Sequence, residues 1–200
     1  MAGLGEGPAQ PAPENEQHMS DIIVLPGIGG SGPDHWQSLW QAEDPSMSRF
    51  QPSDWNRPDL ADWLAALRRA IAEAPRPPVL LAHSLACLLV PHWAAAGGAG
   101  IAGALLVAPP DPVSPPFPDE AAGFAPVPLQ TLPFPTRVAI SANDPFGSPD
   151  YGRNFAFSLG AELVEVGPLG HVNAASGVGR WPQGRTLLSD FLAGLDRTRP

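Results

Sequence analysis

Short apolar runs along this chain alternate with stripes of apolar residues at helical spacing. A continuous apolar run predicts a strand that is covered on both faces, as in a parallel sheet. Such runs lie at residues 21–25, 79–82, 101–108 and 137–141. A short strand is also predicted at 48–52, and an alternating run at 161–166 predicts a strand nearer the edge of the sheet.

The helical stripes lie between these runs. Helices are predicted from about residue 34, over 58–75, over 85–96 and over 187–195. Pro91 lies inside the third of these helices and removes one backbone hydrogen bond, so we expect a kink or an early end there. Strands that alternate with helices predict an α/β fold, with a single-domain, mostly parallel, doubly wound sheet and helices on both faces. We assign this domain to residues 21–200.

The N-terminal segment differs in composition from the rest of the chain. Residues 1–20 are rich in Gly, Pro, Ala, Gln and Glu without periodic apolar residues, which predicts a disordered tail. This segment lacks the basic start and apolar core of a signal peptide. No apolar run in the sequence has the length of a membrane span.

Charge and cysteine content restrict the function further. The formal net charge of −9 argues against a nucleic-acid partner, because phosphates require a basic surface. Cys87 is the single cysteine, so an internal disulfide is excluded and a reducing compartment, the cytoplasm, is expected. The histidines and acids show no helical ligand spacing such as His-Glu-x-x-His, so no metal and no cofactor are predicted.

Ser84 lies where an apolar run ends and a predicted helix begins. A nucleophile elbow, Gly-x-Ser-x-Gly, has this form, since a strained strand-to-helix turn lifts the serine hydroxyl clear of the sheet. Here the flanking positions are Ala82 and Ala86 rather than glycines. The alternative is that Ser84 serves only as the N-cap of the helix, a position that serine favours.

A glycine-dense loop follows the first strand, at residues 26–32. Its glycines do not form Gly-x-Gly-x-x-Gly and are not followed by Gly-Lys-Ser/Thr, so a dinucleotide or phosphate cradle is disfavoured. An oxyanion loop fits better than a plain tight turn, because glycines let backbone N–H groups face a tetrahedral intermediate. The predicted donors are the N–H groups of Ile28 and Leu85.

Two further residues complete a candidate catalytic triad. Asp144 and His171 follow the two late strands, and the chain order Ser84, Asp144, His171 is that of a hydrolase with a parallel sheet. A serine needs an imidazole to take its proton, and the imidazole needs a carboxylate to hold its tautomer. Asp111 also follows a strand and is the rival carboxylate; Asp144 is preferred.

The chain resembles the small serine hydrolases akin to retinoblastoma-binding protein 9. The resemblance covers about residues 21 to 195 and is carried by the motifs at 25–32, 35–36, 82–87, 108–111, 141–145, 167–174 and 181–182. It implies a compact α/β-hydrolase fold with a minimal cap, with Ser84 as nucleophile, Asp144 as acid and His171 as base. Ala86 departs from the glycine that this family usually has there.

The predicted reaction is cleavage of a small ester or related acyl bond through an acyl-enzyme on Ser84. The predicted substrate pocket is lined by Gly27, His35, Trp36, Phe117, Phe146 and Trp181. The proline-rich segment 111–135 either caps this pocket or packs on the surface. The alternative function is a non-catalytic module that binds a protein partner on a hydrolase scaffold. A nucleotide-binding enzyme is disfavoured, because the phosphate loop is lacking.

Overall fold

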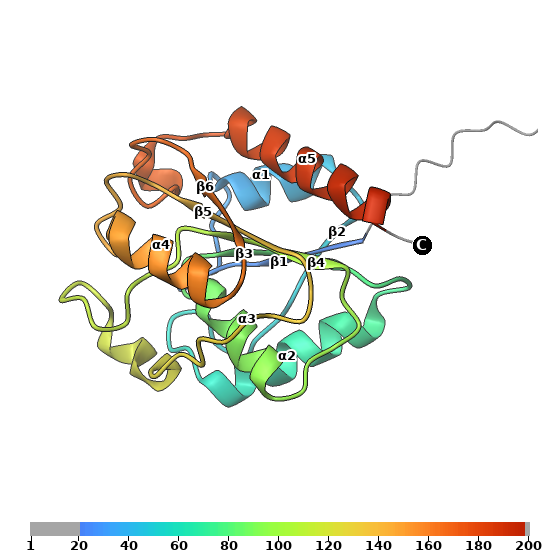
Figure 1. The fold of residues 1–200 in the computed structure, drawn as a ribbon, viewed down its shortest axis with the longest axis horizontal. Coiled ribbons are helices and arrows are strands. Elements are labelled where there is room, and N and C mark those ends of the chain that lie inside the picture. The colour runs from blue at the N-terminus through green and yellow to red at the C-terminus, as the bar shows by residue number, and fades with distance from the viewer. Residues whose placement is uncertain (1–20, 199–200) are drawn as a thin grey trace, which may run out of the picture.

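Six strands form one sheet in which every neighbouring pair is parallel, in the order β2-β1-β3-β4-β5-β6 (Figure 1). The computed structural model describes residues 21–198. The strands are β1 Ile22–Leu25, β2 Met47–Arg49, β3 Val79–His83, β4 Gly103–Val107, β5 Thr136–Ile140 and β6 Glu162–Glu165. The predicted α/β class with a doubly wound parallel sheet is confirmed. The predicted tail, residues 1–20, lies outside the described residues.

Helices cover both faces of this sheet. They are α1 Trp36–Glu43, α2 Leu60–Glu73, α3 Ala86–Ala95, α4 Pro149–Ser158 and α5 Pro182–Thr198. Figure 1 shows α1 and α5 on one face and α2, α3 and α4 on the other. None of these helices, within residues 21–198, is long and apolar enough to cross a membrane.

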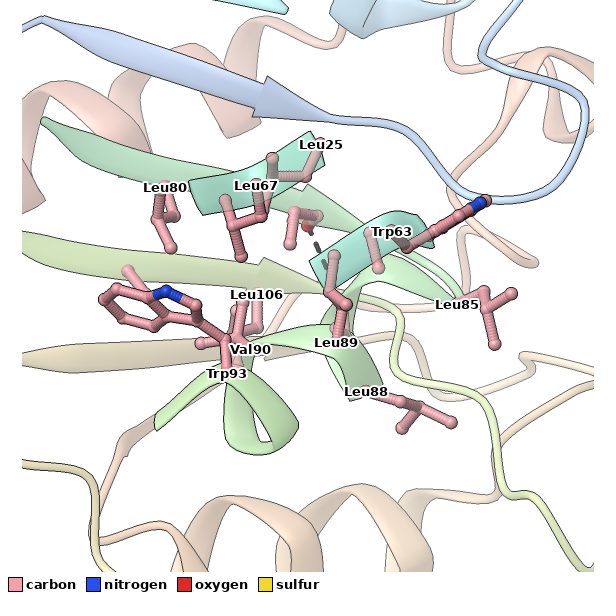
Figure 2. Packing of buried hydrophobic residues seen from close by; sticks show 14 of the residues in the cluster. Leu25, Trp63, Leu67, Leu80, Leu85, Leu88, Leu89, Val90, Trp93 and Leu106 are labelled. Carbon is pink, nitrogen blue, oxygen red and sulfur yellow. Dashed lines mark hydrogen bonds between the residues drawn. The ribbon is translucent and has the colours of Figure 1, made fainter. Parts of the chain in front are cut away.

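The two faces have separate hydrophobic cores, and alternate residues of the inner strands β1, β3, β4 and β5 enter opposite cores. In β1, Ile23 and Leu25 pack with α2 and α3, whereas Ile22 and Val24 pack with α1 and α5. Figure 2 shows the first core, where Trp63 and other residues of α2 and α3 meet the strand leucines. A strand covered on both faces must be apolar at every position, which explains the continuous apolar runs.

Some predicted boundaries were wrong. The second strand is Met47–Arg49 rather than 48–52, and Phe50 follows it as a fully buried core residue. Helix α3 does not end early at Pro91 but continues to Ala95. Pro91 is buried there, so tertiary packing outweighs the lost hydrogen bond.

Helix α4 was not predicted, because it carries few apolar residues and contains Gly152. A Cβ at residue 152 would lie 2.6 Å from Cγ2 of Ile140, so glycine lets α4 approach strand β5 closely. The segment 111–135 includes the short 3-10 helix η1, Asp119–Phe124, whose Phe124 is fully buried in the core. The middle of the segment therefore packs on the domain, as one of the two interpretations required.

Candidate active site

Ser84 occupies a strained corner between β3 and α3. Its φ of 56° lies in the left-handed region, which residues with a Cβ rarely adopt. The backbone is held there because the Ser84 N–H donates to the Val107 carbonyl of β4, at 3.0 Å. Leu85 is the N-cap residue of α3, and no side chain caps that helix. The interpretation of Ser84 as a helix cap is therefore wrong, and its hydroxyl is available for another partner.

That partner is the imidazole of His171. Ser84 Oγ lies 2.7 Å from His171 Nε2, and His171 Nδ1 lies 2.9 Å from both Oδ1 and Oδ2 of Asp144. The side chains of His171 and Asp144 are 9% and 2% exposed, so water hardly competes for these contacts. Asp111, the rival carboxylate, instead accepts the Val113 N–H at 3.0 Å. A proton on Nδ1 bonded to Asp144 leaves Nε2 free to accept the serine proton.

Two polar residues hold the loop that carries His171. Asn143 Oδ1 accepts the Gly170 N–H at 2.7 Å and the Ser141 hydroxyl at 3.0 Å. Ser141 Oγ in turn accepts the Leu169 N–H at 2.9 Å. The loop after β6 is thus tied to the loop after β5, which fixes the position of His171. Sequence reasoning missed these residues, although both belong to the same motif as Asp144.

His83 holds the same loop from the nucleophile side. Its Nε2 lies 2.9 Å from the carbonyl oxygen of His171, and since a carbonyl only accepts, His83 donates from Nε2. Burial, followed by the nearby His171 and His35, lowers the pKa of His83 well below its usual value. The ring is therefore neutral at neutral pH.

The residues that carry the two predicted oxyanion donors, Ile28 and Leu85, line a cavity together with Ser84. Within residues 21–198, no protein acceptor bonds the backbone N–H of Ile28 or of Leu85. Gly27 brings the loop close, because a Cβ on residue 27 would lie 2.8 Å from Cβ of Ser84. Arg49 stabilises the loop by donating a hydrogen bond to the Gly30 carbonyl at 2.6 Å.

Two cavities meet at Ser84. The first, of about 260 Å³, is lined by Ile28, Ser84, Leu85, Pro110, Phe117, Pro118, Phe146, His171 and Asn173. The second, of about 220 Å³, is lined by Gly27, Ile28, Gly29, Ser31, Gly32, His35, His83, Ser84, His171, Asn173, Ala174 and Ala175. The first is walled mainly by apolar side chains, and the second by loop backbone and histidines. Phe117 belongs to the first part of the segment 111–135 and lines the first cavity. This part of the segment therefore lies beside the pocket, as the interpretation of the segment as a cap requires.

Four of the six residues predicted for the pocket line these cavities, namely Gly27, His35, Phe117 and Phe146. Trp36 and Trp181 do not, because they are 0% and 3% exposed and pack against each other with ring centroids 5.2 Å apart. Their assignment to the pocket wall was wrong, since both rings lie in the core between the sheet and α1 and α5. Trp36 Nε1 donates to the Val172 carbonyl at 2.8 Å and so supports the residue after His171.

The chain is similar to a known protein family and to solved structures. The sequence matches the serine hydrolase family over residues 22–190. A YdeN-like hydrolase from Pectobacterium atrosepticum is 34% identical, with a TM-score of 0.78 over 87% of this chain and 91% of that chain. The ydeN gene product of B. subtilis is 19% identical, with a TM-score of 0.72 over 88% of this chain and 100% of that chain.

An esterase from Thermogutta terrifontis shares the fold at 15% identity, with a TM-score of 0.63 over 88% of this chain and 90% of that chain. No curated protein shows a significant match to the sequence. The fold is that of the α/β hydrolases. By its sequence and its structure, the chain belongs to the serine hydrolase family, of which retinoblastoma-binding protein 9 is also a member.

Proposed function

We propose that this protein hydrolyses small esters or related acyl compounds through an acyl-enzyme on Ser84. The 2.7 Å contact between Ser84 Oγ and His171 Nε2 carries the proposal, together with Asp144 on the other ring nitrogen. A serine hydroxyl is a weak nucleophile alone and becomes effective when an oriented imidazole takes its proton. Asp144 is proposed to hold the tautomer of His171 and to stabilise the imidazolium.

The proposed reaction begins with acylation of Ser84. Ser84 Oγ attacks the acyl carbonyl carbon while its proton passes to His171 Nε2. The carbonyl oxygen becomes negative and accepts hydrogen bonds from two backbone N–H groups, those of Ile28 and Leu85. The bond to the leaving group breaks as His171 returns the proton to the departing atom.

Deacylation repeats these steps with water. His171 Nε2 takes a proton from the water, whose oxygen attacks the acyl carbon and forms the second tetrahedral intermediate. Its collapse releases a carboxylic acid, and Ser84 recovers its proton from His171. Because His83 is neutral, it places no positive charge beside the imidazolium that forms on His171.

The first cavity sets the proposed acyl group. Its volume of about 260 Å³ lies just below the usual range of ligand pockets, about 300–1,000 Å³, and its walls include Leu85, Phe117 and Phe146. A short apolar acyl chain fits such walls. The compartment we propose is the cytoplasm, supported by the buried free thiol of Cys87.

The direct test is hydrolysis of acetate, butyrate and octanoate as p-nitrophenyl esters, with the matching thioesters and anilides, by the full chain. Turnover should be highest for a short acyl chain, and Ser84→Ala should lower kcat by about a millionfold. Ser189→Ala is the matched control, because Ser189 Oγ only donates to the Arg185 carbonyl on α5. Equal turnover by Ser84→Ala and wild type would contradict the proposal.

A further inference from the structure

Gln37 is a fully buried amide whose side-chain polar atoms all form hydrogen bonds. Its Nε2 donates to the Leu25 carbonyl at 3.3 Å and to the Leu81 carbonyl at 3.0 Å. Its Oε1 accepts the Ser31 hydroxyl at 2.7 Å. Because carbonyl oxygens only accept, the amide nitrogen must lie toward the two strands and the amide oxygen toward Ser31. One side chain thus joins three separate segments of the chain.

These three segments are the ones that carry the nucleophile and the oxyanion loop, residues 26–32. Leu81 lies in β3, the strand that leads into Ser84. Leu25 is the last residue of β1, directly before the loop, and Ser31 lies near the other end of the loop. The sheet itself already pairs β1 with β3. The contact with Ser31 therefore ties the far end of the oxyanion loop to a strand pair that is already fixed.

The backbone at this end of the loop has an unusual conformation. Gly29, Gly30 and Ser31 have φ angles of 81°, 71° and 52°, all in the left-handed region. Glycine adopts this region readily, whereas Ser31 carries a Cβ and adopts it at an energetic cost. Such a conformation persists where the surrounding structure holds it. Gln37 holds it through the Ser31 hydroxyl, and the Ser38 hydroxyl holds it by donating to the Ser31 carbonyl.

The same part of the loop orients the Ile28 N–H, the proposed oxyanion donor. The Gly30 N–H donates to the Gly27 carbonyl at 3.1 Å, which closes a tight turn with Ile28 at its first central position. Ser31 directly follows this turn, so a movement of Ser31 moves the turn with it. The loop lies close against the nucleophile, since a Cβ on residue 27 would lie 2.8 Å from Cβ of Ser84. A small movement of the turn therefore changes the position of the donor relative to the reacting atoms.

We propose that Gln37 is a positioning residue for the oxyanion hole. By tying the loop to β1 and β3, it keeps the Ile28 N–H where the carbonyl oxygen of the substrate becomes negative. Gln37 is not among the residues that line the two cavities, so it acts through Ser31 and not on the substrate. This inference rests on the proposed hydrolase function and adds to it a residue outside the triad and the pocket.

The proposed role predicts a particular kinetic effect. An oxyanion donor stabilises the tetrahedral intermediate and its transition states more than it stabilises the bound ester. A misplaced donor should therefore lower kcat and leave KM nearly unchanged. A purely structural role of Gln37 would instead lower the thermal midpoint of unfolding and leave kcat of the folded fraction unchanged.

Ser31→Ala and Gln37→Met remove the contact from its two ends. Ser31→Ala removes only the hydroxyl of a half-buried loop residue and keeps its Cβ, so this variant tests the proposal even if Gln37→Met does not fold. With p-nitrophenyl butyrate, kcat should fall about tenfold in Ser31→Ala and about 10- to 100-fold in Gln37→Met, with little change in KM. The double variant should be no slower than Gln37→Met, because the second substitution removes a contact that is already lost.

A transition-state analogue separates positioning from a structural role. Propyl trifluoromethyl ketone carries the same acyl chain as the butyrate ester. Ser84 Oγ adds to its carbonyl carbon, the serine proton passes to His171 Nε2, and the carbonyl oxygen becomes an oxyanion that stays bound. In each variant, the inhibition constant of this ketone should rise by the same factor by which kcat/KM falls.

Ser53→Ala and Gln183→Met are the matched controls and should keep the wild-type constants. The Ser53 hydroxyl donates to Asp62 Oδ1 in an exposed contact, and Gln183 is exposed on α5. Neither control residue lines either of the two cavities.

Three results would overturn the role of Gln37 while the hydrolase function stands. They are an unchanged kcat in Ser31→Ala, losses that multiply in the double variant, and an unchanged inhibition constant of the ketone where kcat falls. Failure of the full wild-type chain to turn over any ester and to react with a fluorophosphonate at Ser84 overturns both proposals.

Discussion

His83 Nε2 donates to the carbonyl oxygen of His171 over 2.9 Å, although the two residues are 88 positions apart in the sequence. The residue before the candidate nucleophile therefore positions the backbone of the candidate base. The two ring centroids are 5.1 Å apart, so His83 also packs against the imidazole that it positions. This contact ties the corner after β3 to the loop after β6.

His83→Phe should lower kcat by about 10- to 100-fold with little change in KM, because a shift of about 1 Å in His171 costs about that much. Steady-state kinetics on the preferred ester measure both constants. His83→Gln should restore most of kcat, since its amide N–H can reach the same carbonyl. If His83→Phe lowers the free energy of unfolding, measured in urea, but keeps the wild-type kcat, then His83 has only a structural role.

Gly27→Ala should impair the oxyanion loop. The new Cβ would lie 2.8 Å from Cβ of Ser84 and 3.2 Å from its Oγ, so the loop must move and carry the Ile28 N–H with it. Loss of one oxyanion donor costs about 100- to 1000-fold in kcat. Gly194→Ala is the control, because a Cβ on that residue of α5 meets nothing within 4 Å. Equal kcat in the two variants would contradict the assigned role of the loop.

Asn143→Leu should reduce kcat by at least about tenfold, because Gly170 loses its acceptor and one of the hydrogen bonds between the His171 loop and the loop after β5 is removed. Asn143→Asp keeps an acceptor oxygen and should retain most of the activity. Measuring kcat together with the thermal midpoint separates positioning from stability. If Asn143→Asp and Asn143→Leu lower kcat equally, the hydrogen bond to Gly170 is not what positions His171.

Acid should destabilise the fold through His35. Its pKa is lowered from 6.5 to about 4 by burial and by the charges of Arg49 and His171. Between pH 4 and pH 6.5 the unfolded chain binds a proton at His35 that the folded chain does not bind. The stability that the neutral His35 contributes is therefore complete above pH 6.5 and is lost as the pH falls toward 4.

From about pH 7 to about pH 5, this loss amounts to on the order of 2 kcal/mol. Urea unfolding of wild type and His35→Asn at both pH values measures it. The variant should lose about that much less stability than the wild type over the same interval. Parallel losses in the two proteins would show that His35 does not titrate as described.

The sequence located Ser84, Asp144 and His171 because each follows an apolar run that forms a strand of one parallel sheet. Carboxyl ends of parallel strands share an edge, so side chains at those ends come together without further information. The structure does bring these three within hydrogen-bond distance, and their catalytic roles stay predictions.

The rest depended on contacts between distant residues. Trp36 and Trp181 belong to motifs beside the site, yet a motif does not tell on which side of the backbone a ring lies, and both rings face the core. The roles of His83 and Asn143 arise from hydrogen bonds to the loop of residues 167–171, which only the folded chain brings near. Local patterns contain no signal for such pairs.

Labelling with a fluorophosphonate tests the central claim, that Ser84 is an activated nucleophile. The full chain is incubated with the probe, and the modified residue is mapped by mass spectrometry in wild type, Ser84→Ala, His171→Ala and the control Ser189→Ala. We expect one label per chain at Ser84 in wild type and in Ser189→Ala, and none in the other two. A folded wild-type chain that stays unlabelled, or a label that persists in Ser84→Ala, would contradict the account and favour a non-catalytic binding module.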